Sequence, residues 1–213
     1  MELTKEKLEK SILKRVGAFR IFQSVLLGEG TFGTVYLASM NSEEKTISLS
    51  QTFYAAKAIN KKDIDPKKLS RFEEAISTEI SILRALNHQS IVKLIDVRST
   101  ENRFYLIFEY CSGGTLEAYR KKKQGKVLME EESREIVKQI AEAMIFCLDR
   151  ETPIIHRDLK PANILMMNGM VKISDFGFAR IVENNSEKLK LTINIGKIWE
   201  IKVLWENENL LKN

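Results

Sequence analysis

Cysteines and long apolar runs are both scarce in this chain. Only two cysteines occur in the 213 residues, Cys111 and Cys147, and their separation is not a metal-ligand spacing. So few thiols are typical of a reducing intracellular compartment. No apolar run approaches the length of a membrane span, residues 1–7 contain no signal-peptide core, and Glu2 stands where a myristoylation signal requires glycine. We therefore expect a cytoplasmic protein without a membrane span.

Features of a nucleic-acid-binding protein are also missing. The net charge is +5 and the pI is about 9.1, but the basic residues are spread along the chain. The densest basic run, residues 120–123 (RKKK), lies in a polar segment that is typical of a solvated helix end. No aromatic residues interleave with it, as a base-stacking platform would require. We expect no nucleic-acid partner.

The composition is that of a globular chain with a sizeable core, since 44% of the residues are hydrophobic and 30% are charged. Residues 1–18 are expected to form a charged helical lead-in, because Leu3, Leu8, Ile12 and Leu13 have helix-like spacing. Residues 41–51 are expected to be a mobile polar insertion between strands. The predicted strands are residues 21–27, 35–38, 53–59, 91–97 and 104–110, and the predicted helices are residues 69–86 and 130–150.

The most informative stretch reads HRDLKPAN at residues 156–163 and is followed by DFG at residues 175–177. It places a carboxylate, a cation, an amide and a second carboxylate within twenty residues. Phosphoryl transfer needs such a set, because it requires a proton acceptor, a positive charge and hard oxygen ligands for magnesium. The four residues are Asp158, Lys160, Asn163 and Asp175.

A glycine-rich segment lies upstream, at residues 28–35 (GEGTFGTV). This pattern alone is weak, because dinucleotide-binding loops share it. Such a loop joins a strand to a helix, whereas a strand is predicted on each side of this one. The loop is therefore expected to be a hairpin whose glycines, Gly28, Gly30 and Gly33, let backbone N–H groups approach phosphates closely. An ordinary hairpin is the alternative.

A single lysine, Lys57, interrupts the apolar strand predicted at residues 53–59. A lysine in such a strand is costly to bury unless it is paired, and its partner is expected on the following helix. Glu79 lies beside the apolar face of that helix. Glu73 and Glu74 are equally available by composition, but the spacing to the loop before the next strand favours Glu79.

Taken together and in this order, the four motifs resemble the protein kinase family over residues 20–196. The HRDLKPAN form resembles serine/threonine kinases, and DFGFAR at residues 175–180 is similar to the form in kinases that start autophagy and in several calcium-regulated kinases. The resemblance implies an α+β, two-lobed kinase-like fold with a complete small lobe at residues 19–108 and a hinge and truncated large lobe at residues 109–196.

The resemblance also implies the role of each motif residue, with ATP and Mg²⁺ as cofactors. Asp158 would be the catalytic base and Lys160 would neutralise charge on the transferred group. Asn163 and Asp175 would bind Mg²⁺, and Asp175 would thereby contact the nucleotide. The ATP phosphates would be positioned by the pair Lys57 and Glu79 and covered by Gly28, Gly30 and Gly33.

An adenine site follows from the same resemblance. Phe108 would be the gatekeeper, the backbone of Glu109 and Cys111 would hydrogen-bond adenine, and Glu117 would reach the ribose. The residues expected to sandwich adenine are Val35, Ala55 and Leu165. The residues that match the stack joining the lobes of active kinases are Leu83, Leu94, His156 and Phe176. For each aliphatic residue, the alternative role is ordinary packing in the core. His156 is expected to pack and hydrogen-bond rather than to act in acid–base chemistry.

The resemblance ends near residue 196, and residues 197–213 form a tail unlike a kinase. The tail has no Ala-Pro-Glu motif, and roughly a hundred residues of a usual kinase domain are missing. A retained intron, a frameshift or a wrong gene model would explain the change. Without its usual packing partner, the helix at residues 130–150 is expected to expose apolar surface. Arg157 usually pairs with a phosphorylated residue, and Thr192 is the nearest candidate.

Two functions follow from these observations. The first is a serine/threonine protein kinase, a transferase that moves the γ-phosphoryl group of ATP to hydroxyls of protein substrates. The second is a catalytically inactive truncated kinase that binds nucleotide or a regulatory kinase partner. Nucleotide binding would not distinguish them, whereas turnover would.

Overall fold

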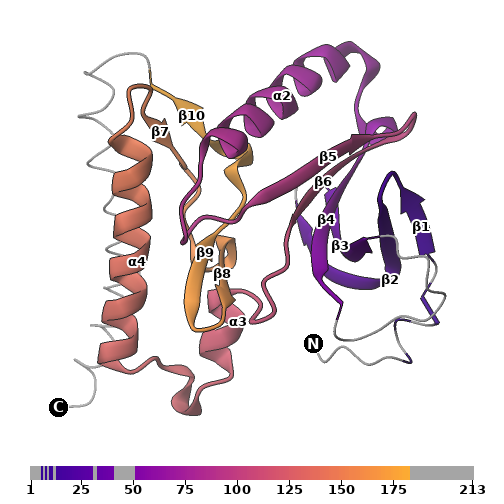
Figure 1. Cartoon of the computed structure of the whole chain (residues 1–213). Helices are drawn as coiled ribbons and strands as arrows, with labels where there is room; N and C mark the ends of the chain where they lie inside the picture. The colour runs from indigo at the N-terminus through magenta and orange to yellow at the C-terminus, as the bar shows by residue number, and fades with distance from the viewer. Residues whose placement is uncertain are drawn as a thin grey trace. The chain divides into compact units, whose positions relative to one another are not determined.

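The computed structural model describes residues 6, 8, 10–11, 13–30, 33–40 and 51–182 of the chain (Figure 1). The chain folds into two compact units. The first unit consists of Met1–Glu74 and Lys93–Tyr110, and the second consists of Ala75–Val92 and Cys111–Asn213. Within the described ranges, no helix is both long and apolar enough to cross a membrane.

The first unit is built on a six-stranded antiparallel sheet, whose strands follow the order β1-β2-β3-β4-β6-β5 (Figure 1). Two 3₁₀ turns, Lys61–Asp63 and Pro66–Lys68, lead from β4 into α2. The strands are β1 (Leu13–Val16), β2 (Phe19–Gly30), β3 (Gly33–Met40), β4 (Phe53–Asn60), β5 (Leu94–Ser99) and β6 (Arg103–Glu109).

Each face of this sheet carries its own apolar cluster, because successive side chains on a strand point to opposite faces. One cluster contains Val16, Phe19, Ile21, Ala38, Ala56, Ala58, Tyr105 and Ile107. The other contains Leu8, Phe22, Val25 and Leu37. Leu37 pairs with Ala55, and Val35 pairs with Lys57, so these four residues share the second face.

The predicted helical lead-in is wrong at its C-terminal end. Residues 13–16 form strand β1, which pairs with β2 from Leu13↔Phe22 to Val16↔Phe19. A tight turn at Gly17, where φ is +58°, joins the two strands. Pairing within the sheet therefore overrides the helix-like spacing of the leucines, although residues 6 and 8 are helical and Leu8 is fully buried.

The strand predicted at residues 91–97 is displaced towards the C-terminus. Strand β5 begins at Leu94, whereas Ile91 forms an isolated parallel bridge with Ile173 of the second unit. The backbone N–H of Val92 donates to the carbonyl of Ile173 at 2.9 Å. Residues 91 and 92 therefore belong to the second unit, and the apolar run 91–97 is divided between two sheets.

The second unit contains most of α2 (Leu69–Ala85), together with α3 (Leu116–Lys121) and α4 (Glu130–Leu148). Both long helices lie where they were predicted. Two short antiparallel pairs complete the unit: β8 (Ile164–Met167) with β9 (Met170–Ile173), and β7 (Ile154–Ile155) with β10 (Arg180–Ile181). The basic run closes α3 as an exposed helix end, as predicted.

Helix α4 and strand β9 are joined by a buried hydrogen bond. Oε1 of Gln139 accepts from the backbone N–H of Val171 at 2.9 Å, while Nε2 of Gln139 donates to Glu135. The apolar stripe of α4 packs around Gln139, with Ile136, Ile140, Ala143 and Cys147 all buried. On the same helix Ile145 is 63% exposed, so part of the exposed apolar surface expected on this helix is present.

Several predictions lie outside the described residues. These are the polar insertion at residues 41–50, Leu3 and Ile12 of the lead-in, Thr192, and the tail at residues 197–213.

Candidate active site

The loop at residues 156–163 lies in the second unit, between β7 and β8, and ends in a 3₁₀ turn at Pro161–Asn163. Arg157 adopts a φ of +65°, and its Nε donates to the carbonyl oxygen of Phe178 at 2.6 Å. This contact holds the start of the loop against the segment that follows DFG.

Asp158 is the centre of a hydrogen-bonded cluster. Its Oδ2 accepts from Nζ of Lys160 and from Nδ2 of Asn163, both at 2.8 Å, and its carbonyl oxygen accepts from Nδ2 of Asn163 at 2.9 Å. Burial raises the pKa of the Asp158 carboxyl, but the hydrogen bonds from Lys160 and Asn163 outweigh it, so the pKa lies below its ordinary value. The carboxylate is therefore ionised, and able to accept a proton, at neutral pH.

His156 is buried and contacts the backbone of this cluster. Its Nε2 lies 2.9 Å from the carbonyl oxygen of Ser174, and its Nδ1 accepts from the backbone N–H of Asp158 at 3.3 Å, which places the proton on Nε2. The ring packs edge-on against Phe176 with centroids 4.7 Å apart. Burial lowers the pKa of His156, so the imidazole is neutral. The prediction that His156 packs and hydrogen-bonds is confirmed.

Ser174 links the two motifs of the second unit. Its backbone N–H and its Oγ both donate to the carbonyl oxygen of Asn163, at 2.8 and 3.0 Å. Asp175 follows directly with a φ of +61°, a left-handed conformation that re-aims the chain as it leaves β9. Asn163 and Asp175 are thus brought together through one serine. Sequence reasoning missed Ser174 and Gln139; the signal for Gln139 was a polar residue within the apolar stripe of α4.

Glu79 lies next to the DFG segment within the second unit. A Cβ built on Gly177 would lie 3.6 Å from Oε2 of Glu79 and 3.4 Å from Oδ1 of Asp175, so both carboxylates surround this glycine. Glu79 is 8% exposed, whereas Glu73 and Glu74 are exposed. Burial thus singles out, among these three acids, the one that the spacing favoured.

The other candidate residues of the nucleotide phosphate site lie in the first unit. Strand pairing places Val35 opposite both Gly28 and Lys57, and Gly30 opposite Gly33. Gly33 has a φ of +150°, and a Cβ there would lie 2.3 Å from the carbonyl oxygen of Ala58. Close packing of β3 on β4 therefore requires glycine at this position, a reason that sequence reasoning did not find.

The predicted hinge begins at the end of β6. Ala55 pairs with Phe108, and Glu109 is tied to Lys93 twice: the N–H of Glu109 donates to the Lys93 carbonyl at 3.1 Å, and Oε1 of Glu109 accepts from the Lys93 N–H at 2.8 Å. Cys111 is buried, like Cys147 on α4. Burial raises the pKa of the Cys147 thiol to about 11, so Cys147 is a packing residue and not a reactive thiol.

Beyond the hinge, the chain packs on strand β8 of the second unit. Thr115 bridges to Leu165, and the N–H of Gly113 donates to the Met166 carbonyl at 2.9 Å. Glu117 forms an ion pair with Lys121 at 2.7 Å, one turn along α3. The hydrogen bond from Lys121 lowers the pKa of the Glu117 carboxyl. Its expected contact with a ribose would require this exposed pair to open.

The sequence motifs, the six-stranded sheet and the geometry of the loop at residues 156–163 are together typical of a protein kinase. Comparison with known protein families agrees. The protein kinase domain family matches residues 22–199 of the chain. The chain belongs to the protein kinase family, and the predicted family and α+β kinase-like fold class are confirmed.

Its relatives are serine/threonine kinases. The chain is 37% identical over 166 residues to human serine/threonine-protein kinase tousled-like 2, covering 76% of this chain and 20% of the relative. It is 37% identical over 180 residues to human serine/threonine-protein kinase ULK1, covering 80% and 16%. It is 38% identical over 159 residues to CBL-interacting serine/threonine-protein kinase 19 of Arabidopsis thaliana, covering 73% and 29%. The matched region therefore spans less than a third of each of these relatives.

Proposed function

We propose that this chain transfers the γ-phosphoryl group of ATP to serine or threonine hydroxyls of proteins. The observation that carries the proposal is the cluster in which Lys160 and Asn163 both donate to Oδ2 of Asp158. This arrangement keeps the carboxylate ionised, as a group that accepts the proton of a hydroxyl must be. The proton would pass to Asp158 as the substrate oxygen bonds to phosphorus and the bond from phosphorus to the leaving ADP oxygen breaks.

The donor set suits magnesium. Because Nδ2 of Asn163 donates to Asp158, Oδ1 is the atom of this amide that would face a metal. Asp175 would supply the second oxygen ligand, and Ser174 holds the two residues together. Mg²⁺ is commonly bound through one or two carboxylates plus substrate phosphates, so a small protein set of this kind is sufficient. When bound, the metal neutralises charge on the phosphates.

Residues of the first unit would position the phosphates of the nucleotide. Lys57 stands opposite Val35, and Val35 stands opposite Gly28, so one row of paired residues would place a cation beside the glycine-rich backbone. We assign the adenine site to Val35, Ala55, Leu165 and the backbone of Glu109 and Cys111, and the ribose contact to Glu117. Buried Glu79 is the proposed partner of Lys57.

The test is magnesium-dependent transfer of labelled phosphate from ATP to a generic basic protein substrate, with Asp158→Asn as the matched variant. Asparagine keeps the shape of the side chain and one acceptor oxygen, but an NH2 donor replaces the other oxygen, so the side chain cannot take the proton. We expect transfer to fall by about 10²- to 10⁴-fold. If folded protein transfers no more phosphate than the variant, the motifs reflect ancestry, and the alternative of an inactive module that binds nucleotide or a partner kinase stands instead.

A further inference from the structure

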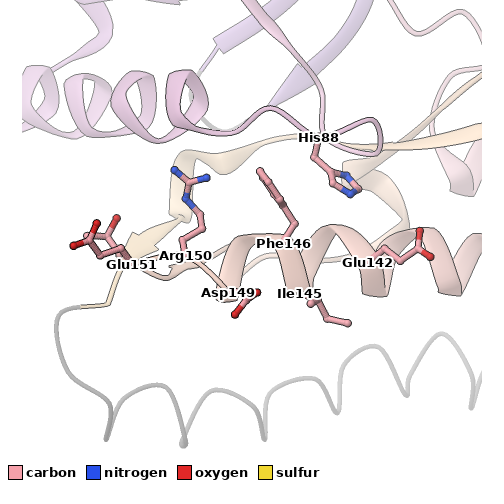
Figure 2. Close-up of a pocket in the computed structure, with 8 residues that line it drawn as sticks. His88, Glu142, Ile145, Phe146, Asp149, Arg150 and Glu151 are labelled. Atoms are coloured by element: carbon pink, nitrogen blue, oxygen red, sulfur yellow. The ribbon is translucent and has the colours of Figure 1, made fainter.

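A pocket of about 640 Å³ lies in the second unit, between the C-terminal end of α4 and the loop that precedes β5 (Figure 2). None of the residues that line it has a role in the proposed phosphoryl transfer. Its two walls come from segments more than fifty residues apart, since His88 lies in the loop and Glu142 to Thr152 lie on or just after α4.

The floor of the pocket is aromatic and apolar. The ring of His88 lies 5.1 Å from the ring of Phe146, and the guanidinium of Arg150 lies 5.6 Å from the centre of the same ring. Figure 2 shows these three side chains between the loop and the helix. Ile145, beside Phe146, is 63% exposed. The stack of His88 on Phe146 joins both walls, so the pocket is formed before any ligand arrives.

The rim of the pocket is acidic. Glu142 on α4 and Asp149, the C-cap of this helix, are seven residues apart and so lie on the same side of the helix as Ile145 and Phe146. Glu151 follows the helix. All three carboxylates are exposed, and within the described part of the chain none of them forms an ion pair. Arg150 is the one cation among the lining residues. The residues that line the pocket therefore carry a net negative charge, whereas the net charge of the whole chain is +5.

We propose that this pocket binds a basic peptide segment of a partner protein, with an aliphatic side chain against Ile145 and Phe146. Lysine or arginine side chains of the peptide would lie beside Glu142 at one end of the pocket and beside Asp149 and Glu151 at the other (Figure 2). Lysine and arginine suit such a place because their methylene stems cover apolar surface while the charged end stays in water. An acidic peptide would meet three like charges, and so would the phosphates of a nucleic acid or an anionic membrane. Charge complementarity therefore selects a basic protein segment.

The first test compares two labelled peptides of equal length on the full chain by fluorescence anisotropy. One alternates lysine or arginine with leucine, and the other carries glutamate in place of every basic residue. We expect the basic peptide to bind and the acidic one not to bind. Binding should weaken as salt rises from about 0.1 M to about 1 M, because the Debye length shrinks from about 10 Å to about 3 Å.

Matched variants locate the binding. The double variant Glu142→Gln/Glu151→Gln removes two rim charges, and Glu101→Gln/Glu131→Gln removes two exposed charges elsewhere. Each changes the net charge by the same amount and touches exposed side chains, so folding is retained. We expect about tenfold weaker binding of the basic peptide in the rim variant and less than about twofold in the control, as two partly screened charge pairs are lost. Ile145→Ser should also weaken binding, at unchanged charge.

Several outcomes would overturn the proposal. Equal weakening in both double variants would mean attraction to overall charge and not to the pocket, and equal binding of the acidic peptide would have the same meaning. Absence of binding by the basic peptide would reject it outright. If the chain self-associates and Glu142→Gln/Glu151→Gln abolishes this, the occupant of the pocket is a second copy of the chain and not a partner protein. Binding needs neither ATP nor turnover, so Asp158→Asn should bind the peptide normally, which separates this test from that of the proposed kinase activity.

Discussion

The first unit places its candidate residues through backbone pairing, whereas the second unit places them through side-chain hydrogen bonds. Gly28, Val35 and Lys57 are aligned by the ladders between β2, β3 and β4. Asp158 and Asn163, by contrast, lie outside the strands and are fixed by each other and by Ser174. We therefore expect a side-chain change to reduce activity most in the second unit, and a change at a backbone-restricted position to reduce stability most in the first.

The largest effect is expected from Asn163→Ala. This change removes both hydrogen bonds to Asp158 and one proposed magnesium ligand, so phosphate transfer should fall by about a hundredfold or more. The measurement is initial rate of transfer at varied magnesium. Asn163→Asp is the informative companion, because it keeps an oxygen ligand but loses the donated hydrogen bonds. Equal rates for Asn163→Ala and the unchanged protein would remove Asn163 from the site.

Substitutions at Gly33 and Gly28 test whether backbone packing in the first unit determines its stability. Gly33→Ala should destabilise the protein by about 1–3 kcal/mol, because the new methyl would meet the Ala58 carbonyl oxygen at 2.3 Å. Gly28→Ala is the matched control, since a Cβ there meets no atom of the described chain within 4 Å. Urea unfolding of the two variants measures the difference. Equal stability would show that β3 and β4 adjust freely and that pairing does not determine the position of Lys57.

A stability measurement can also test the hydrogen bond between Gln139 of α4 and Val171 of β9 in the second unit. Gln139→Leu leaves the buried N–H of Val171 without its acceptor, which should cost about 1–3 kcal/mol in urea unfolding. Exposed Lys138, the preceding residue on α4, gives the control Lys138→Leu, which should stay within about 0.5 kcal/mol. A loss confined to the Gln139 variant would confirm that a side-chain bond secures the strand leading to Asp175. Comparable values for the two variants would contradict this role.

The smallest effect is a dependence of stability on pH. Burial lowers the pKa of His156 from its ordinary 6.5, so as pH falls the unfolded chain takes up a proton before the native state does. Stability should decline as pH falls through 6.5 towards the folded pKa. Asp158, whose pKa is lowered from 3.8, acts in the same direction at lower pH. Unfolding of the unchanged protein and of His156→Gln measures this slope, and an unaltered slope in the variant would exclude His156 as its source.

Much of the architecture was readable from local pattern. Helices α2 and α4 were predicted because their apolar residues recur at helical spacing over more than four turns, and β4 and β6 because each is a short apolar run between polar segments. The lead-in failed because its leucines fit a helix equally well, while the contact that makes residues 13–16 a strand is pairing with β2. Residues 91 and 92 were misplaced because Ile173, eighty residues away, competes for them.

The family, the order of the elements and the identity of the motif residues could be predicted from the sequence, since each depends on residues close together in the chain. Three features became visible only in the folded chain: which acid on α2 is buried, why Gly33 must lack a side chain, and that Ser174 and Gln139 hold β9 and the residue that precedes DFG. Tertiary structure also assembled the acidic pocket from His88 and α4. Burial and hydrogen bonding depend on which distant segments contact each other in the fold. The spacing of apolar residues within one segment carries no information about those contacts.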